Sequence, residues 1–274
     1  MTSLYAKLGV QLQKTKGDCF MTSTVPEKTK SMSRPYVTDT LLFGVDSETC
    51  ASTKLQNNLT EFEWVRRNKV YPIFWGRYIN GENALSSDEI RFLREKCCKI
   101  ALQYLSEEIK NTEGNGRADA TKAMKLAKSL NIPQGVALFL EIPANEVATG
   151  PYLKGFSQAF LEGGYTPGFK VNTDAEYSFD REFGGAYRAQ EEIMRQSLIW
   201  AVAPTLEEFD QINTTHLIQP KLWKPYAPGV LRRTDIAIWQ YGKDCHKIFD
   251  DDDNLTQFNI NLVRDESIII NKMY

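Results

Sequence analysis

Short apolar runs alternate with longer stretches of helical periodicity from residue 41 onward. Seven of these runs have the length and composition of strands covered on both faces, as in parallel sheets. They are Leu41–Asp46, Tyr71–Arg77, Lys99–Tyr104, Val136–Ile142, Gly168–Asn172, Leu198–Ala203 and Ile236–Gln240. The alternation is weakest over residues 216–230.

The stretches between the runs predict helices. Ser86 followed by Glu89 is the pattern of a capping box, which predicts a helix over Ser86–Lys96. Further helices are expected at Ala118–Leu130, Pro151–Glu162 and Ala186–Arg195. Repeated strand–helix alternation is typical of parallel βαβ units.

An open sheet and a closed barrel share this alternation, and two features favour the barrel. The segment after the first run, GVDSETCAS, lacks the GxGxxG loop of dinucleotide-binding sheets. Polar residues end several runs, where barrels place their chemistry. We therefore predict an α/β fold, a single (β/α)₈ TIM-like barrel over residues 41–274. Residues 1–40, rich in Lys, Thr and Ser, are expected to be an N-terminal arm or irregular lead-in.

The charge balance excludes some partners. With 33 basic and 35 acidic residues, the net charge of −2 predicts no attraction to nucleic acid. No run approaches the roughly 20 apolar residues that span a bilayer. Met1–Lys16 shows no signal-peptide pattern, so we expect a cytoplasmic protein or one exported by a leaderless or cleaved route. The oligomeric state is left open.

Cysteine and histidine are too sparse for a metal centre. The five cysteines form no CxxC pair and the chain has two histidines, so neither a metal site nor a cofactor is expected. The odd cysteine count predicts free thiols.

Polar and aromatic residues at the strand ends are the candidate site. In a barrel they project into one mouth at the carboxyl ends of the strands. Carboxylates, amides and aromatic rings together suit a carbohydrate ligand, whose ring faces are apolar and whose edges carry hydroxyls. We take Glu141 and Asp46 as candidate catalytic residues. The candidate substrate-binding residues are Arg77, Tyr78, Gln103, Asn172, Trp200, Trp239 and Gln240.

Structural alternatives exist for several of these residues. Asp46 could cap the following helix. Glu141 lies in the apolar run VALFLEI, where an unpaired carboxylate is costly, so an ion pair with Arg77 is an alternative to catalysis. Trp200 and Trp239 could simply fill the core.

These residues carry a family resemblance over roughly residues 41–263. The chain resembles glycoside-hydrolase-like barrels of unknown function that are related to the family-25 lysozymes (muramidases). The matching segments, in order, are GVD (44–46), FWGRYI (74–79), LSSDEIRFL (85–93), DATKAMKLAKSLNIPQGVALFLEI (119–142), LEGGYTPGFKVN (161–172) and IWQY (238–241).

The resemblance implies a cell-wall or polysaccharide hydrolase with an altered catalytic pair. Asp46 matches the aspartate of the lysozymes' first strand. Their fourth strand ends in Asp-x-Glu, whose Glu is the catalytic acid. The segment here is Glu141-Ile142-Pro143, which puts Pro143 at the position of that acid. The family's final Asp-x-Asn segment becomes FNIN, with Asn259 in place of the Asp.

Three functions remain open from the sequence. The first is hydrolysis of a glycan with Glu141 or Glu146 as acid and Asp46 as partner. The second is a non-catalytic barrel that binds a glycan or a protein, because proline cannot transfer a proton. The third, a barrel enzyme for a phosphate ligand, lacks the glycine-rich loop expected before the last helix.

Overall fold

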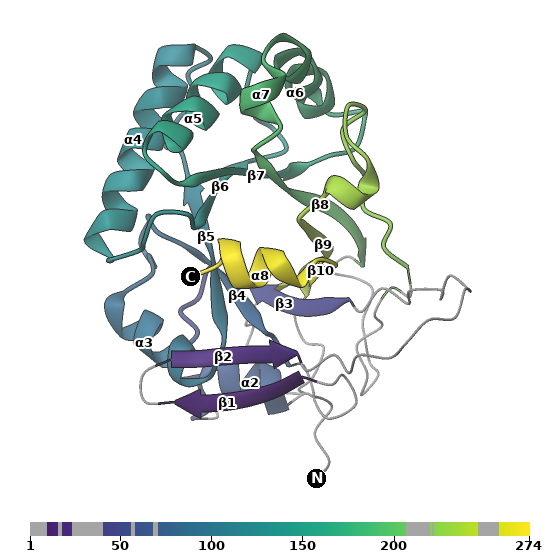
Figure 1. The fold of residues 1–274 in the computed structure, drawn as a ribbon. Coiled ribbons are helices and arrows are strands. Elements are labelled where there is room, and N and C mark those ends of the chain that lie inside the picture. Colours follow the sequence, from purple (N-terminus) through teal and green to yellow (C-terminus); the bar gives the residue numbers. More distant parts are fainter. Residues whose placement is uncertain are drawn as a thin grey trace, which may run out of the picture.

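A computed structural model describes residues 41–55, 58–67, 71–206, 220, 222–245 and 258–274, with the backbone alone at 10–15, 18–23, 206 and 245. Eight strands close into a barrel in the order β10-β3-β4-β5-β6-β7-β8-β9, which confirms the predicted barrel (Figure 1). Their bounds are β3 (Leu42–Asp46), β4 (Phe74–Tyr78), β5 (Lys99–Leu105), β6 (Ala137–Ile142), β7 (Thr166–Asn172), β8 (Leu198–Leu206), β9 (Ile238–Cys245) and β10 (Phe258–Val263).

The barrel differs from an all-parallel one at its last strand. Neighbouring strands from β3 to β9 pair in parallel. The strand β10, which the apolar pattern did not predict, runs antiparallel to both β9 and β3. It brings Asn259 opposite Asp46, so the antiparallel strand delivers amide side chains to the barrel mouth.

Three of the four predicted helices are present with shifted ends, whereas the predicted helix Ala186–Arg195 is interrupted at Gln190 and falls into two helices. The helices are α2 (Glu61–Arg67), α3 (Ser87–Glu95), α4 (Glu113–Ser129), α5 (Gly150–Glu162), α6 (Ser178–Ala189), α7 (Glu191–Met194) and α8 (Glu266–Lys272). The Ser86 hydroxyl accepts the backbone N–H of Glu89, as predicted. The Glu89 carboxylate does not close the capping box, because it contacts Arg77 and the backbone N–H of Ala51 instead.

Side-chain alternation along the strands separates two apolar layers. One layer lies between the barrel and its helices and includes Val45, Trp75, Leu102 and Phe169. The other fills the barrel interior, with Phe74, Ala101, Phe139, Trp200 and Ile238 among its members. The interior is therefore a packed core beneath the mouth.

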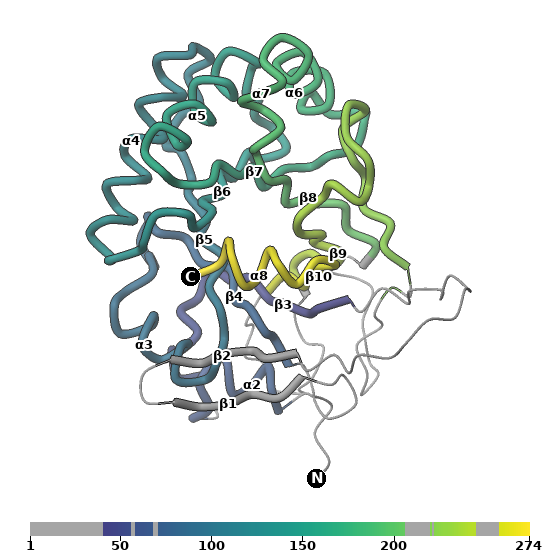
Figure 2. The backbone as a smooth tube through the Cα atoms, viewed as in Figure 1, coloured from purple at the N-terminus to yellow at the C-terminus, as the bar shows by residue number. Residues whose placement is uncertain are grey.

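The C-terminal helix closes the end of the barrel opposite the mouth. Ile269 and Met273 of α8 belong to the interior cluster. Tyr274 exchanges two backbone hydrogen bonds with Ile100, near the start of β5. Figure 2 shows the yellow α8 segment across this end of the barrel. This end of the barrel is therefore covered.

The N-terminal segment contains regular structure. In the segment expected to be irregular, β1 (Val10–Thr15) and β2 (Asp18–Ser23) pair as a two-stranded antiparallel sheet.

Cys97 is in a disulfide, which makes the prediction of free thiols wrong for that residue, while Cys50 and Cys98 are free. No helix in the described ranges is long and apolar enough to cross a membrane.

Candidate functional site

A buried lysine occupies the centre of the mouth. Lys170 lies at an inward position of β7 and is 2% exposed. Its Nζ lies 2.8 Å from Asp46 Oδ2, 2.8 Å from Gln103 Oε1 and 3.3 Å from Glu141 Oε2. The ammonium group of Lys170, on β7, thus links side chains from β3, β5 and β6.

The three contacts use the full donor capacity of the lysine, because an ammonium carries three N–H donors. Burial lowers the pKa of Lys170, but Asp46 and Glu141 outweigh it and hold that pKa well above its usual value. Lys170 therefore stays protonated. It is a fixed positive charge and has no free electron pair for nucleophilic attack.

Asp46 is held on the other side by amides from β10. Asn261 donates its Nδ2 to Asp46 Oδ1 at 2.6 Å, and Asn259 donates to Oδ2 at 2.9 Å. Asn261 is oriented in turn by Trp200, whose Nε1 donates to its Oδ1 at 2.8 Å. Asp46 is 2% exposed, so it serves here as a buried acceptor rather than as a helix cap.

Glycine at position 76 makes room for this arrangement. A Cβ there would lie 2.5 Å from the Asp46 Cβ, 2.5 Å from Gln103 Nε2 and 2.7 Å from the Trp200 ring. The backbone of β4 can therefore approach Asp46 and Gln103 this closely only because residue 76 has no side chain.

Glu141 is the most accessible acid of the network. Its side chain is 26% exposed, and the Tyr78 hydroxyl donates to the same oxygen, Oε2, that contacts Lys170. Burial, with a smaller contribution from Glu141, raises the pKa of Tyr78, and Lys170 offsets only part of this rise. Tyr78 therefore remains a hydroxyl donor and orients the Glu141 carboxylate.

Arg77 does not face Glu141, so the ion pair offered as the alternative role of Glu141 is wrong. Its position on β4 alternates with Gly76 and points toward the helices. Arg77 Nε lies 2.9 Å from Glu89 Oε1 on α3, and both side chains are fully buried. Its remaining nitrogens donate to the backbone carbonyls of Ser47 and Asn83. Arg77 thus secures the β3 and β4 connections from outside the barrel, and Lys170 is the cation beside Glu141.

The tryptophans are core residues here. Trp239 points outward, donates its Nε1 to the Ala203 carbonyl at 2.9 Å and packs edge-on against Trp223. Trp200 points inward and contacts Phe139 in a T-shaped pair. Trp200 is fully buried and forms the floor below Lys170, whose Nζ lies 5.1 Å from its ring centroid.

The other predicted residues lie at or near the mouth. Gln103 and Gln240 are both buried at inward positions of β5 and β9. Asn172, at the end of β7, uses its Oδ1 to accept the Asp174 backbone N–H.

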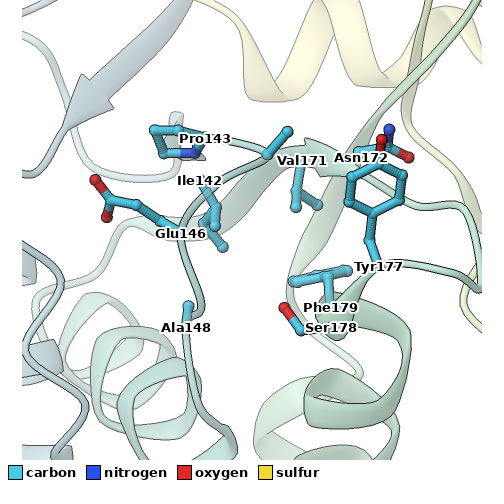
Figure 3. Close-up of a pocket in the computed structure, with 10 residues that line it drawn as sticks. Ile142, Pro143, Glu146, Ala148, Val171, Asn172, Tyr177, Ser178 and Phe179 are labelled. Carbon is cyan, nitrogen blue, oxygen red and sulfur yellow. The ribbon is translucent and has the colours of Figure 1, made fainter.

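Beside the mouth, Asn172 lines a shallow pocket with Pro143, Glu146 and Tyr177. Figure 3 shows this pocket between the segment after β6 and the start of α6. The Glu146 carboxylate points away from Asn172 and Tyr177 in this view.

Sequence reasoning missed Lys170 and gave Asn259 and Asn261 only a motif match. A signal for Lys170 was present, since it is a lysine in the apolar run TPGFKVN and in phase with Asn172. Its phase within a strand covered on both faces already implied a buried, paired cation. Asn259 and Asn261 required knowledge of β10.

Comparisons with known proteins agree with this geometry. An uncharacterized protein from B. stearothermophilus superposes with a TM-score of 0.68 at 24% identity, over 85% of this chain and 100% of that chain. A family 25 glycosyl hydrolase from Bacillus anthracis gives a TM-score of 0.50 at 11% identity, over 85% and 94% of the two chains. These identities establish a shared fold alone. No protein of curated function matches by sequence.

The sequence itself supplies the family. The profile described as Rv2525c-like, glycoside hydrolase-like domain matches residues 71–255, which is more than half of the chain. That span includes Tyr78, Gln103, Glu141, Lys170 and Gln240 of the mouth. The chain therefore belongs to the Rv2525c-like, glycoside hydrolase-like domain family.

Proposed function

We propose that this barrel binds a carbohydrate, such as a cell-wall glycan, in its mouth and does not hydrolyse it. The family and the likeness to a family 25 glycosyl hydrolase support a carbohydrate ligand. The observation that carries the loss of hydrolysis is the position of Lys170 between the two candidate catalytic carboxylates.

Glycoside hydrolysis needs an acid that gives a proton to the leaving oxygen. The Oε2 atom of Glu141 accepts from both the Lys170 ammonium and the Tyr78 hydroxyl. That oxygen is therefore already occupied by two donors from the protein and is not free to meet a leaving oxygen. The position of the catalytic acid in the resembling lysozymes is occupied here by Pro143.

The second candidate carboxylate, Asp46, is also hydrogen-bonded within the chain. A nucleophile or base must reach the sugar's anomeric centre or an attacking water. Asp46 is 2% exposed, and its oxygens accept from Lys170, Asn259 and Asn261. The ammonium occupies the space between Asp46 and Glu141 in which the scissile bond of a glycosidase lies.

Binding requires no proton transfer, so the mouth can bind a ligand that it does not hydrolyse. Both contacts of Glu141 fall on Oε2, and its side chain is 26% exposed, so Oε1 is left for a ligand hydroxyl or amine. Tyr177, at the start of α6, is 39% exposed beside the pocket of Figure 3 and offers a ring face to a sugar.

One observation favours the alternative of a retaining hydrolase. Because both carboxylates contact the same Nζ atom, Asp46 Oδ2 and Glu141 Oε2 are at most about 6 Å apart, close to the spacing of about 5–5.5 Å in retaining enzymes. Lys170 would have to leave the site for that spacing to serve catalysis.

Retention on insoluble glycans and release of reducing ends separate the two functions. The wild-type protein should be retained on peptidoglycan or another polysaccharide and release no reducing ends. Glu141→Gln should weaken retention. The control Glu95→Gln changes an exposed glutamate at the end of α3, near the barrel end opposite the mouth, and should leave retention unchanged.

Two results would contradict the proposal. One is release of reducing ends by the wild type that falls about 10²-fold or more in Glu141→Gln, as loss of a general acid requires. The other is absence of retention on every glycan tested.

A further inference from the structure

We propose that the mouth selects sugars that carry an ammonium group, that is, amino sugars with a free amine, over sugars that carry a carboxylate. This inference rests on the proposed function and names the ligand class. It follows from which hydrogen-bonding groups of the mouth are already used and from the sign of the surrounding charge.

The mouth has no spare cation in its described part. At the inward-facing strand ends that the structure describes, Lys170 is the one cationic side chain. Its three N–H donors already go to Asp46, Gln103 and Glu141. A ligand carboxylate would therefore find no charged partner there and would lie close to Asp46 and Glu141. Like charges at such range are costly where water is excluded.

The connections that leave the carboxyl ends of β3 to β7 are acidic. Residues 47–60, 79–86, 106–112, 143–149 and 173–177 contain seven carboxylates and two lysines. The acids are Glu48, Glu82, Glu107, Glu108, Glu146, Asp174 and Glu176, and the bases are Lys54 and Lys110. The network inside adds two carboxylates and one lysine. The summed charge of these five connections and of the network attracts cations.

A buried acceptor points to a ligand independently of the acids. Gln240 is 2% exposed, and its Oε1 has no hydrogen-bond partner in the described part of the chain. It alternates with Ile238 of the interior cluster, so its side chain points into the barrel. Buried acceptors in folded proteins are normally paired, which calls for an N–H or O–H donor from outside the described residues, a role that a ligand can fill.

The corresponding unpaired donor is neutral. Gln103 Nε2 has no partner among the described residues and lies against Gly76. It can serve a ligand hydroxyl, but it does not neutralise a carboxylate. An ammonium, with three donors and no acceptor, matches the available oxygens of Glu141 and Gln240.

Soluble oligosaccharides of equal length test the selectivity. The probes are an oligomer of glucosamine, the same oligomer N-acetylated, and an oligogalacturonate, titrated calorimetrically at slightly acid pH. We expect affinity to fall in that order, with the first bound at least about tenfold more tightly than the last. High salt should reduce this ratio, because it screens the charges.

Two variants assign the effect to the mouth. Glu141→Gln keeps the shape and removes a charge, so it should remove most of the preference for the amine. Gln240→Leu removes a buried acceptor, so it should keep or raise the melting temperature and still weaken binding. Glu95→Gln is the control for both and should change neither.

The outcomes separate this inference from the proposed function. Glycan binding with equal or better affinity for the oligogalacturonate overturns the ligand class alone. The same holds if Glu141→Gln and Gln240→Leu both bind as the wild type does. Absence of binding to all three probes and to insoluble glycans overturns the proposed function together with this inference.

Discussion

Removing the buried ammonium should destabilise the barrel strongly. Lys170→Met keeps most of the volume of the side chain and deletes its charge and donors. Asp46 loses its 2.8 Å ion pair, Glu141 its 3.3 Å ion pair, and Gln103 Oε1 its donor. Two carboxylates then face each other across the mouth with no cation between them.

The expected loss follows from which groups remain buried. Breaking a buried ion pair by removing one partner costs about 3–5 kcal/mol, because the other charge is left uncompensated. Asp46 keeps its two amide donors, whereas Glu141 can reach solvent with its 26% exposed side chain. We therefore place the loss at the lower end, about 3 kcal/mol at neutral pH.

The loss should depend on pH in a defined direction. The pKa of Lys170 is raised on folding, so its contribution is fully present at neutral pH and is lost as pH rises from its unfolded pKa through its native pKa, at strongly alkaline pH. The difference between wild type and Lys170→Met should therefore stay constant around neutral pH and shrink at strongly alkaline pH.

Urea unfolding followed by tryptophan fluorescence measures these differences across pH. Lys122→Met is the matched control, because Lys122 is 63% exposed and pairs with Asp119 at 3.3 Å on the surface of α4. It should cost less than about 1 kcal/mol. A loss in Lys170→Met no larger than that of the control, or one independent of pH, would refute the role given to the buried ammonium.

Further predictions concern packing and a second buried acid. Burial raises the pKa of Glu61 to about 8, offset in part by Ser47 and Arg77, so folding favours its protonated form. Its contribution to stability is complete below about pH 4.5 and is lost as pH rises toward 8, so Glu61→Gln should flatten the stability profile over that range in chemical denaturation. Gly76→Ala should cost about 1–3 kcal/mol through overpacking, whereas Gly185→Ala, with open space on α6, should stabilise by about 0.5–1 kcal/mol in the same assay.

The sequence by itself determined the architecture and part of the mouth. Seven apolar runs with polar ends specify strands covered on both faces, because such runs are stable only when both faces are buried. That pattern was enough to place Asp46, Gln103, Glu141 and Gln240 at one end of the barrel, where the structure has them. These features can be predicted from the sequence because each depends on residues that are close together in the chain.

Only the tertiary structure decided which charges meet. Arg77 and Tyr78 are neighbours in sequence, yet one points toward the helices and the other into the mouth, because consecutive side chains of a strand face opposite sides. The partner of Glu141 is Lys170 from the next strand, and Asp46 meets Asn261 across 215 positions through the antiparallel β10. Pairings over such separations leave no local pattern, since barrel closure alone brings the strands together. For this reason the sequence located the carboxylates of the mouth, and the fold determined that an ammonium lies between them.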